Sequence, residues 1–188
     1  MNKSKIILAS KSPRRIELLQ KWGLDFQVIP SNIKEKITHK KPSSIVKSLA
    51  YQKAKDIKQQ SPNSIVIGAD TIVVLNGKIV GKPRNKKHSI QILNELNSSL
   101  HRVYTGVAIL SDNNEIVFYD VAKVKMQKLS HENLKKLFGK HMDKAGAYAV
   151  QDKNDCFVKK IYGDYYTVVG MPYIKLKKEL KKFKIVLK

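Results

Sequence analysis

The sequence predicts an α/β protein with a mixed central sheet flanked by helices. Three observations support this class. Short apolar runs typical of buried strands alternate with segments of helical apolar spacing from end to end of the chain. The pair Asn76-Gly77 between two apolar runs is typical of a hairpin turn. The chain has 188 residues, 42% of them hydrophobic, which is enough to bury the core of one ordinary domain.

The first half of the chain begins with a predicted strand over residues 6–8. A helix follows, because Ser12 suits an N-cap, Pro13 suits the first helical position and Gly23 suits the end. The apolar spacing then predicts a strand at 26–29, a polar loop at 31–44, a helix at 44–60, a strand at 65–75 and a return strand at 78–80.

The second half has the same mixed character. It is expected to contain a helix at 87–97, a hairpin of strands at 103–110 and 116–126, a helix at 131–138, glycine-punctuated strand and loop at 146–170, and a last helix that begins near Pro172.

The net charge of +22 is the largest departure from an ordinary composition. The excess lies in residues 1–62 and 123–188, while the middle of the chain is nearly neutral. A basic field attracts anions, usually phosphates, so nucleotide and nucleic acid are candidate partners. A solvated lysine-rich surface with no partner is the alternative, because only four of the 37 basic residues are arginines.

Several classes of protein are excluded or disfavoured. The apolar runs are shorter than the roughly 18 residues of a membrane span, and the N-terminus lacks the apolar core of a signal peptide. The single cysteine, Cys156, excludes an intramolecular disulfide framework and has no catalytic motif around it. The five histidines are scattered, and we expect them at the surface. The sequence thus indicates a cytoplasmic globular protein with no membrane partner.

The first candidate site is the segment 10–15, at the junction of the first strand and first helix. A helix N-terminus presents unpaired N–H groups and attracts anions. Arg14 and Arg15 lie in this first turn, where they oppose the helix dipole, so a bound phosphate explains them better than helix stability does. A solvated helix start with Ser12 as its cap is the alternative.

The second candidate is Asp70, a carboxylate inside the apolar run 65–75. An isolated buried charge is costly, so Asp70 must be paired, hydrogen-bonded or bound to a metal. It could hold Mg²⁺ or accept a proton from water, and a structural aspartate that caps a loop is the alternative. Gly68 is expected to leave room for the close approach of a ligand.

Two weaker candidates follow. Lys82 lies on a glycine–proline turn from which its ammonium could reach a phosphate. Gln151 is expected to end a short strand, where its amide could contact a base edge, and an ordinary polar loop residue is the alternative.

Five blocks of sequence resemble, in order, the motifs of the Maf family of nucleoside triphosphate pyrophosphatases. The blocks are LASKSPRRIELL, GADTIVVLNGKIVGKP, LNSSLHRVYTG, AGAYAVQ and VVGMP, and they extend from residue 8 to residue 172. The resemblance implies that residues 1–188 form a single Maf-like domain. It also implies a Maf/ITPase-like architecture of two lobes with an active-site cleft between them.

The resemblance assigns roles to individual residues. It implies that Asp70 is the catalytic carboxylate and that the phosphates are held by Ser12, Arg14, Arg15, Lys53 and Lys82. Lys53 enters this set because QKA matches a lysine of the family, and a solvated helix lysine is the alternative.

The substrate branch follows from three positions. Arg14, Thr71 and Gln151 are similar to those of the branch that acts on dTTP and UTP. The 7-methyl-GTP branch has a tryptophan in place of the first arginine and a glutamine after the aspartate. The resemblance therefore implies hydrolysis of dTTP and UTP to the nucleoside monophosphate and pyrophosphate.

The family often has an acidic pair or triad after the second strand, and here only Glu35 keeps the acid within 32–35. Glu35 and Asp70 are expected to bind a divalent metal, Mg²⁺ or Mn²⁺. The expected partner is a small nucleotide and no specific nucleic acid, with a homodimer left open. A basic nucleic-acid-binding protein and a division-regulatory protein with little catalysis remain the alternatives.

Overall fold

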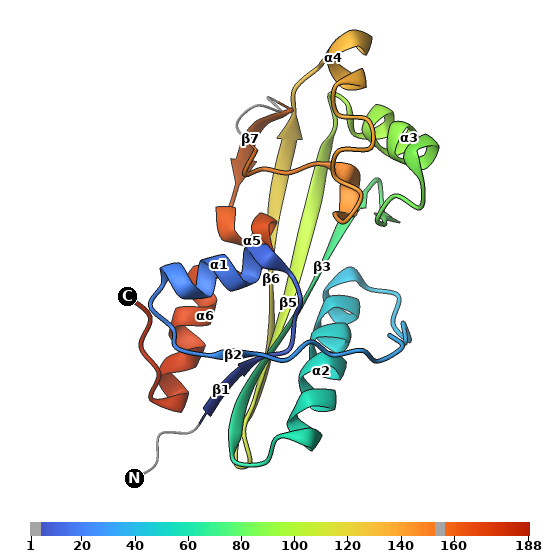
Figure 1. The fold of residues 1–188 in the computed structure, drawn as a ribbon. Coiled ribbons are helices and arrows are strands. Elements are labelled where there is room, and N and C mark those ends of the chain that lie inside the picture. Colours follow the sequence, from blue (N-terminus) through green and yellow to red (C-terminus); the bar gives the residue numbers. More distant parts are fainter. Residues whose placement is uncertain (1–4, 153–156) are drawn as a thin grey trace. The chain divides into compact units, whose positions relative to one another are not determined.

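The computed structural model describes residues 5–152 and 157–188, and Figure 1 follows the chain through them. Within these residues seven strands form one sheet. The strands are β1 (Lys5–Leu8), β2 (Gln27–Val28), β3 (Ser64–Leu75), β4 (Lys78–Val80), β5 (Leu100–Leu110), β6 (Glu115–Met126) and β7 (Val158–Tyr162).

The helices are distributed among these strands along the chain. They are α1 (Pro13–Lys21), α2 (Pro42–Gln60), α3 (Lys86–Leu96), α4 (His131–Lys135), α5 (Tyr165–Val169) and α6 (Tyr173–Leu180), with 3₁₀ turns η1 (Ala145–Ala147) and η2 (Lys181–Phe183). In the described part of the chain no helix is both long enough and apolar enough to cross a membrane.

The sheet is mixed, as the sequence predicts. Its strand order is β2-β1-β3-β5-β6-β7, with β4 paired to β3. Strand β1 runs parallel to β2 and β3, whereas β4 is antiparallel to β3 and β7 is antiparallel to β6. The Asn76-Gly77 turn between β3 and β4 has positive φ at both residues, 49° and 78°, as a two-residue hairpin turn requires.

The chain divides into two compact units. The first comprises the described residues of 1–70, 105–120 and 170–188, and the second those of 71–104 and 121–169. The boundaries between the units fall inside β3, β5 and β6.

The first unit is built around the contact of helix α2 with the sheet. Small residues of the helix, Ala50 and Ala54, lie in one apolar cluster with Ile7 of β1 and Val66 of β3. All four side chains are fully buried or nearly so.

Two glycines let the backbone of α2 come close to the strands. A Cβ atom on Gly68 of β3 would lie 2.4 Å from the carbonyl oxygen of Ala50. A Cβ atom on Gly106 of β5 would lie 2.2 Å from the carbonyl oxygen of Val46. The expectation that Gly68 makes room for a ligand is therefore wrong, because the group that approaches it is the α2 backbone.

The second unit has its own apolar core. Helix α3 contributes Ile92, Leu93 and Leu96, which pack with Val124 of β6 and Phe157. Two of the five histidines are buried rather than exposed, and both belong to this unit. They are His101, with 1% of its surface exposed, and His141, with 6%.

The expected short strand that ends at Gln151 is absent from the described residues 145–152. The backbone there forms the 3₁₀ turn η1 and a further turn. Gly146 and Ala147 both have positive φ, 79° and 56°, which a strand does not accommodate. The N–H of Gly146 donates to the carbonyl of Gly81 at 3.2 Å, so a long-range contact holds this turn.

Candidate active site

The loop from β1 into α1 carries the first predicted site. Ser12 is the N-cap of α1 and Pro13 begins the helix, as expected, but the Ser12 side chain makes no capping hydrogen bond. The N–H of Ser12 instead donates to the Ser10 hydroxyl at 3.3 Å. Arg14 follows in the first turn and is half-buried. The helix start is thus formed by backbone bonds and proline, which leaves the Ser12 hydroxyl out of the cap.

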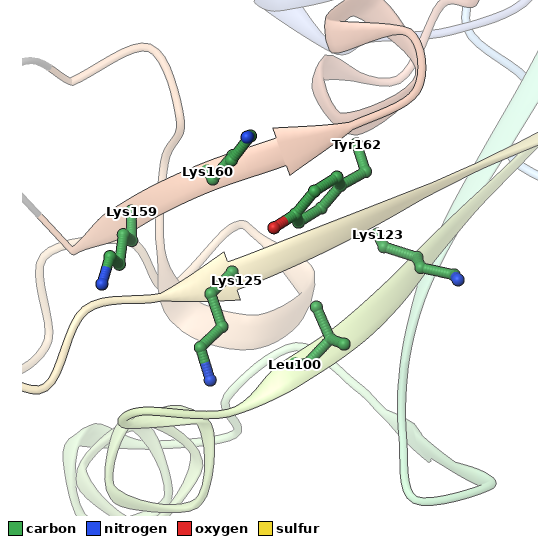
Figure 2. A pocket seen from close by; sticks show the side chains of 6 residues that line it. All are labelled: Leu100, Lys123, Lys125, Lys159, Lys160 and Tyr162. Carbon is green, nitrogen blue, oxygen red and sulfur yellow. The ribbon is translucent and has the colours of Figure 1, made fainter.

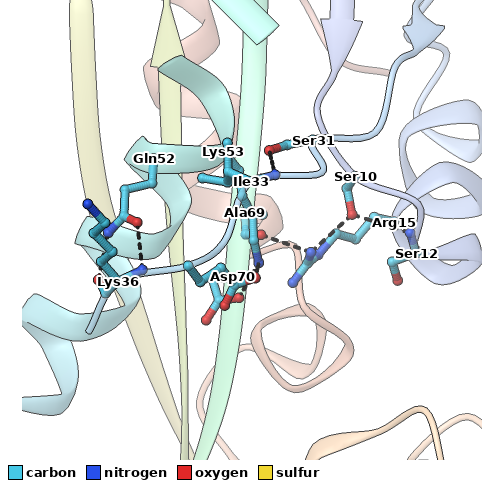
Figure 3. A network of polar contacts seen from close by, with 11 residues as sticks. Ser10, Ser12, Arg15, Ser31, Ile33, Lys36, Gln52, Lys53, Ala69 and Asp70 are labelled. Atoms are coloured by element: carbon cyan, nitrogen blue, oxygen red, sulfur yellow. Dashed lines mark hydrogen bonds and ion pairs between the residues drawn. The ribbon is translucent and has the colours of Figure 1, made fainter. Parts of the chain in front are cut away.

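Arg15 is held by three acceptors of its own unit. Its Nε donates to the carbonyl of Gly170 at 2.9 Å. Its Nη1 donates to the carbonyl of Ala69 at 2.9 Å and to the Ser10 hydroxyl at 3.1 Å (Figure 3). Burial lowers the pKa of this guanidinium, and the nearby carboxylate of Asp70 opposes that shift. The side chain therefore joins the start of α1 to the carbonyl that precedes Asp70.

Lys53 of α2 joins the two predicted carboxylates. Its Nζ lies 2.5 Å from Oδ1 of Asp70 and 2.9 Å from Oε1 of Glu35. The side chains of Lys53 and Asp70 are only 16% and 13% exposed, whereas Glu35 is 43% exposed. Of the three expectations for Asp70, namely pairing, hydrogen bonding or metal binding, the ion pair with Lys53 meets the first. The Lys53 side chain is not solvated, because it is largely buried between the two carboxylates.

The local fold explains this cluster. Gly68 allows α2 to lie directly on β3, and Asp70 comes two residues later on the same strand. Lys53 immediately precedes Ala54, whose backbone nitrogen would lie 2.8 Å from a Cβ on Gly68. The close approach at the glycine thus brings the lysine within reach of the carboxylate.

Gln52 is a site residue that sequence reasoning missed. Its Oε1 accepts from the N–H of Lys36 at 3.0 Å, and its Nε2 donates to the carbonyl of the same residue at 2.8 Å (Figure 3). This two-point contact fixes the loop before α2 next to Glu35. The signal available in the sequence was only its place beside Lys53, because the long-range partner is not visible there.

The remaining predicted residues belong to the second unit. Thr71 follows Asp70 on β3 and is half-buried, and Lys82 and Gln151 are exposed. The hydrogen bond between Gly81 and Gly146 places the turn that carries Lys82 beside the segment that leads to Gln151. The two weaker candidates thus lie on segments that the structure joins at Gly81 and Gly146. Cys156 lies outside the described residues.

The number of acidic side chains near one another determines which residues could bind the predicted metal ion. Among the described residues, no group of three or more His, Cys, Asp or Glu side chains lies close enough to hold a metal ion. Glu35 and Asp70, which share the Lys53 ammonium, supply two carboxylates from the first unit.

Comparison with known proteins identifies the family. The family model described as "Maf-like protein" matches residues 5–183. The fold and the paired carboxylates therefore belong to a member of the Maf family, as the sequence motifs predict.

The relatives are similar over nearly their whole length. A protein of Elusimicrobium minutum named dTTP/UTP pyrophosphatase is 48% identical over 181 residues, which cover 95% of this chain and 98% of that one. A protein of Bacillus anthracis with the same name is 45% identical, with 96% of each chain covered. A third, from Dictyoglomus turgidum, is 43% identical, with 96% of this chain and 97% of the other covered.

Solved structures show a partial likeness. The Ham1 protein of Staphylococcus aureus has 16% identity and a TM-score of 0.45 over 65% of this chain and 72% of its own. A nucleoside-triphosphatase / dITP/XTP pyrophosphatase from Mycobacterium abscessus has 13% identity and a TM-score of 0.43 over 66% of this chain and 75% of its own. These TM-scores lie below the level from which a shared fold follows.

Proposed function

We propose that this chain hydrolyses dTTP and UTP to the nucleoside monophosphate and pyrophosphate, acting as a single Maf-like domain. The observation that carries the proposal is the Glu35–Lys53–Asp70 cluster, found within a chain whose near-full-length relatives are named dTTP/UTP pyrophosphatases. Two carboxylates held by one ammonium form a compact charged group, and phosphoryl transfer depends on positioning and charge more than on covalent chemistry.

We propose Asp70 as the catalytic carboxylate. Water adds across the bond between the α- and β-phosphates, and Asp70 is the group that orients the water and accepts its proton. Its pairing with Lys53 keeps the carboxylate in one orientation. Arg15 acts on the same strand through the carbonyl of Ala69, one residue earlier.

The substrate phosphates need cations and hydrogen-bond donors around them. Arg14 and Ser12 at the start of α1 are proposed for this role, since the Ser12 hydroxyl is not used as a helix cap. Arg15, Lys53 and Lys82 complete the proposed phosphate-binding set.

The proposed metal is Mg²⁺ or Mn²⁺. Glu35 and Asp70 fit such an ion, because Mg²⁺ is commonly held by one or two carboxylates together with substrate phosphates. When bound, the ion would supply charge neutralisation on the phosphate oxygens. Lys53 already bridges both carboxylates and would keep them together in the absence of the ion.

Base selection is assigned to Arg14, Thr71 and Gln151. The amide of Gln151 offers one donor group and one acceptor, which suits the edge of a pyrimidine ring. A base with the wrong edge leaves buried polar groups unpaired, at a cost of about 1–3 kcal/mol each.

The test is pyrophosphate release from dTTP, UTP, CTP, ATP and GTP, measured with and without Mg²⁺ or Mn²⁺. We expect kcat/KM to be highest for dTTP and UTP and to depend on the metal. A flat profile, or a preference for GTP, would contradict the substrate assignment. Release of orthophosphate in place of pyrophosphate would contradict the reaction itself.

A further inference from the structure

Among the described residues, one face of the sheet in the second unit carries a basic groove. Its walls and floor come from three neighbouring strands, β5, β6 and β7 (Figure 2). The groove has a volume of about 540 Å³, and its lining residues, here called the groove residues, are Leu100, Lys123, Lys125, Lys159, Lys160 and Tyr162. None of these six is acidic, and none belongs to the proposed active site.

The strand register places like charges opposite one another. Lys125 of β6 is the direct partner of Lys160 on β7, and Lys123 is the direct partner of Tyr162. Like charges at directly opposed positions destabilise a sheet. The groove therefore carries an electrostatic cost that an anion bound across the two strands would offset.

The floor of the groove is suited to flat, apolar rings. Tyr162 is 50% exposed and Leu100 is 52% exposed, although both are large hydrophobic side chains. The ammonium of Lys160 lies 5.1 Å from the centre of the Tyr162 ring, within the range of a cation–π contact. The Lys125 ammonium is held by the carbonyl of Ser98 at 3.0 Å, at the rim of the groove. An aromatic platform with cations around it is the arrangement that binds single-stranded nucleic acids.

We propose that this groove binds single-stranded nucleic acid without sequence preference. The lysines contact backbone phosphates, and a base stacks on Tyr162. Charge argues against a second copy of this chain as the occupant, since the same four lysines would face one another across the dimer axis. A membrane is bound by apolar faces that insert among the lipids or by basic clusters that can reach its flat anionic surface. Here two apolar side chains and four lysines line a concave groove, which suits a narrow strand better than a flat surface. The proposal is independent of the nucleotide hydrolysis proposed above.

The test uses fluorescence anisotropy with short labelled oligouridylate and oligoadenylate strands on the full chain. The face variant replaces Lys123, Lys125, Lys159 and Lys160 by glutamine. The matched control makes the same replacement by glutamine at four exposed lysines of the first unit, and so removes the same charge. These are Lys21, Lys40, Lys178 and Lys181. Tyr162→Ala and Tyr162→Phe separate the ring from the charges.

We expect the oligouridylate and the oligoadenylate to bind the wild type with similar affinity. Each phosphate contact contributes about 0.7 to the slope of log affinity against log salt for single strands, so the face variant should lower that slope by about 2–3 and the control by far less. Tyr162→Ala should weaken binding about tenfold while Tyr162→Phe retains it. UTP hydrolysis serves as the folding control and should stay at the wild-type level in every variant. The melting temperature should not fall, and in the face variant it should rise, because the opposed charges of Lys125 and Lys160 are removed.

Four results would overturn the proposal. Two concern oligonucleotides: an equal loss of binding in the face and control variants, and no measurable binding by the wild type. The third is a wild type that binds phosphatidylserine vesicles but not oligonucleotides, with that binding lost in the face variant. The fourth is a wild-type dimer that dissociates in the face variant.

Discussion

The Nε2 atom of His101 lies 2.7 Å from the hydroxyl oxygen of Tyr148, and both side chains are buried in the second unit. The two rings also meet edge-on, with centroids 5.5 Å apart. This contact ties β5 to the residue that follows η1, and the preceding Gly146 is bonded to Gly81 next to Lys82. The pair thus holds the turn that leads to Gln151 against the core.

Removing one member of this pair should leave the other unsatisfied. We expect His101→Phe and Tyr148→Phe each to lower the free energy of unfolding by about 1–3 kcal/mol. The double variant should lose less than the sum, because neither buried partner is then left alone. Denaturant unfolding of the four proteins checks this, and strictly additive losses would show that the two side chains do not interact.

The same histidine should make stability depend on pH. Burial lowers the pKa of His101 from 6.5 to about 4. Between these values the unfolded chain binds one more proton, so the free energy of unfolding should fall as pH falls, by up to about 1.4 kcal/mol per pH unit. This contribution is complete above pH 6.5. In His101→Phe the slope between about pH 6 and pH 4.5 should be shallower than in the wild type; an unchanged slope would contradict the assignment.

Asp70→Asn should abolish turnover while the fold persists. We expect kcat for UTP to fall by about 10²–10⁴, because the amide cannot accept the proton. Lys53 still has Glu35 as a partner, so the loss of stability should be modest. The matched control is Asp112→Asn, which also removes a carboxylate paired with a lysine of α2, here Lys58 at 2.8 Å. Hydrolysis near the wild-type rate by Asp70→Asn would remove this residue from the mechanism.

Gln52→Leu should loosen the loop that carries Glu35. It removes both hydrogen bonds to the Lys36 backbone, and we expect kcat/KM to drop about tenfold with a stability loss of about 1 kcal/mol. Gln60→Leu serves as the control, since Gln60 bonds to Asp56 of its own helix. Equal effects of the two variants on kcat/KM would show that the contact of Gln52 with the Lys36 backbone has no role in the site.

Gln151→Ala should narrow the preference for UTP over CTP. We expect the ratio of their kcat/KM values to fall roughly tenfold, while kcat for the better substrate changes much less. Gln59→Ala, at an exposed position of α2, is the control. If the ratio stayed at its wild-type value while both rates fell together, Gln151 would act in the shared chemistry rather than in base selection.

The sequence allowed the first half of the fold to be predicted closely. Helix α1 begins at Pro13 and is followed by Gly23 at φ 72°, and β3 falls within one residue of the expected range. These elements carry local signals, namely apolar spacing and residues with restricted or permissive backbones. The prediction of a strand that ends at Gln151 was wrong because the conformation of this segment is set by a hydrogen bond from Gly146 to Gly81, some 65 residues away.

The candidate site shows the same division. Burial of charge alone required Asp70 to be paired, hydrogen-bonded or bound to a metal, and the motifs supplied Lys53 and Glu35. The position of α2 against β3 determines that one lysine bridges both carboxylates and that Gln52 fixes the loop. Sequence spacing does not encode that distance.

The two glycines beneath α2 constrain how this enzyme could be re-engineered. Helix α2 contacts Gly68 and Gly106 so closely that no space remains for a Cβ atom, so alanine at either position must push the helix outward. The usual route to a more stable variant, replacement of glycine by alanine, would here withdraw Lys53 from Asp70 as it lifts the helix. A designer would therefore gain thermal tolerance more safely at positions such as Gly81, where an added Cβ meets no atom within 4 Å.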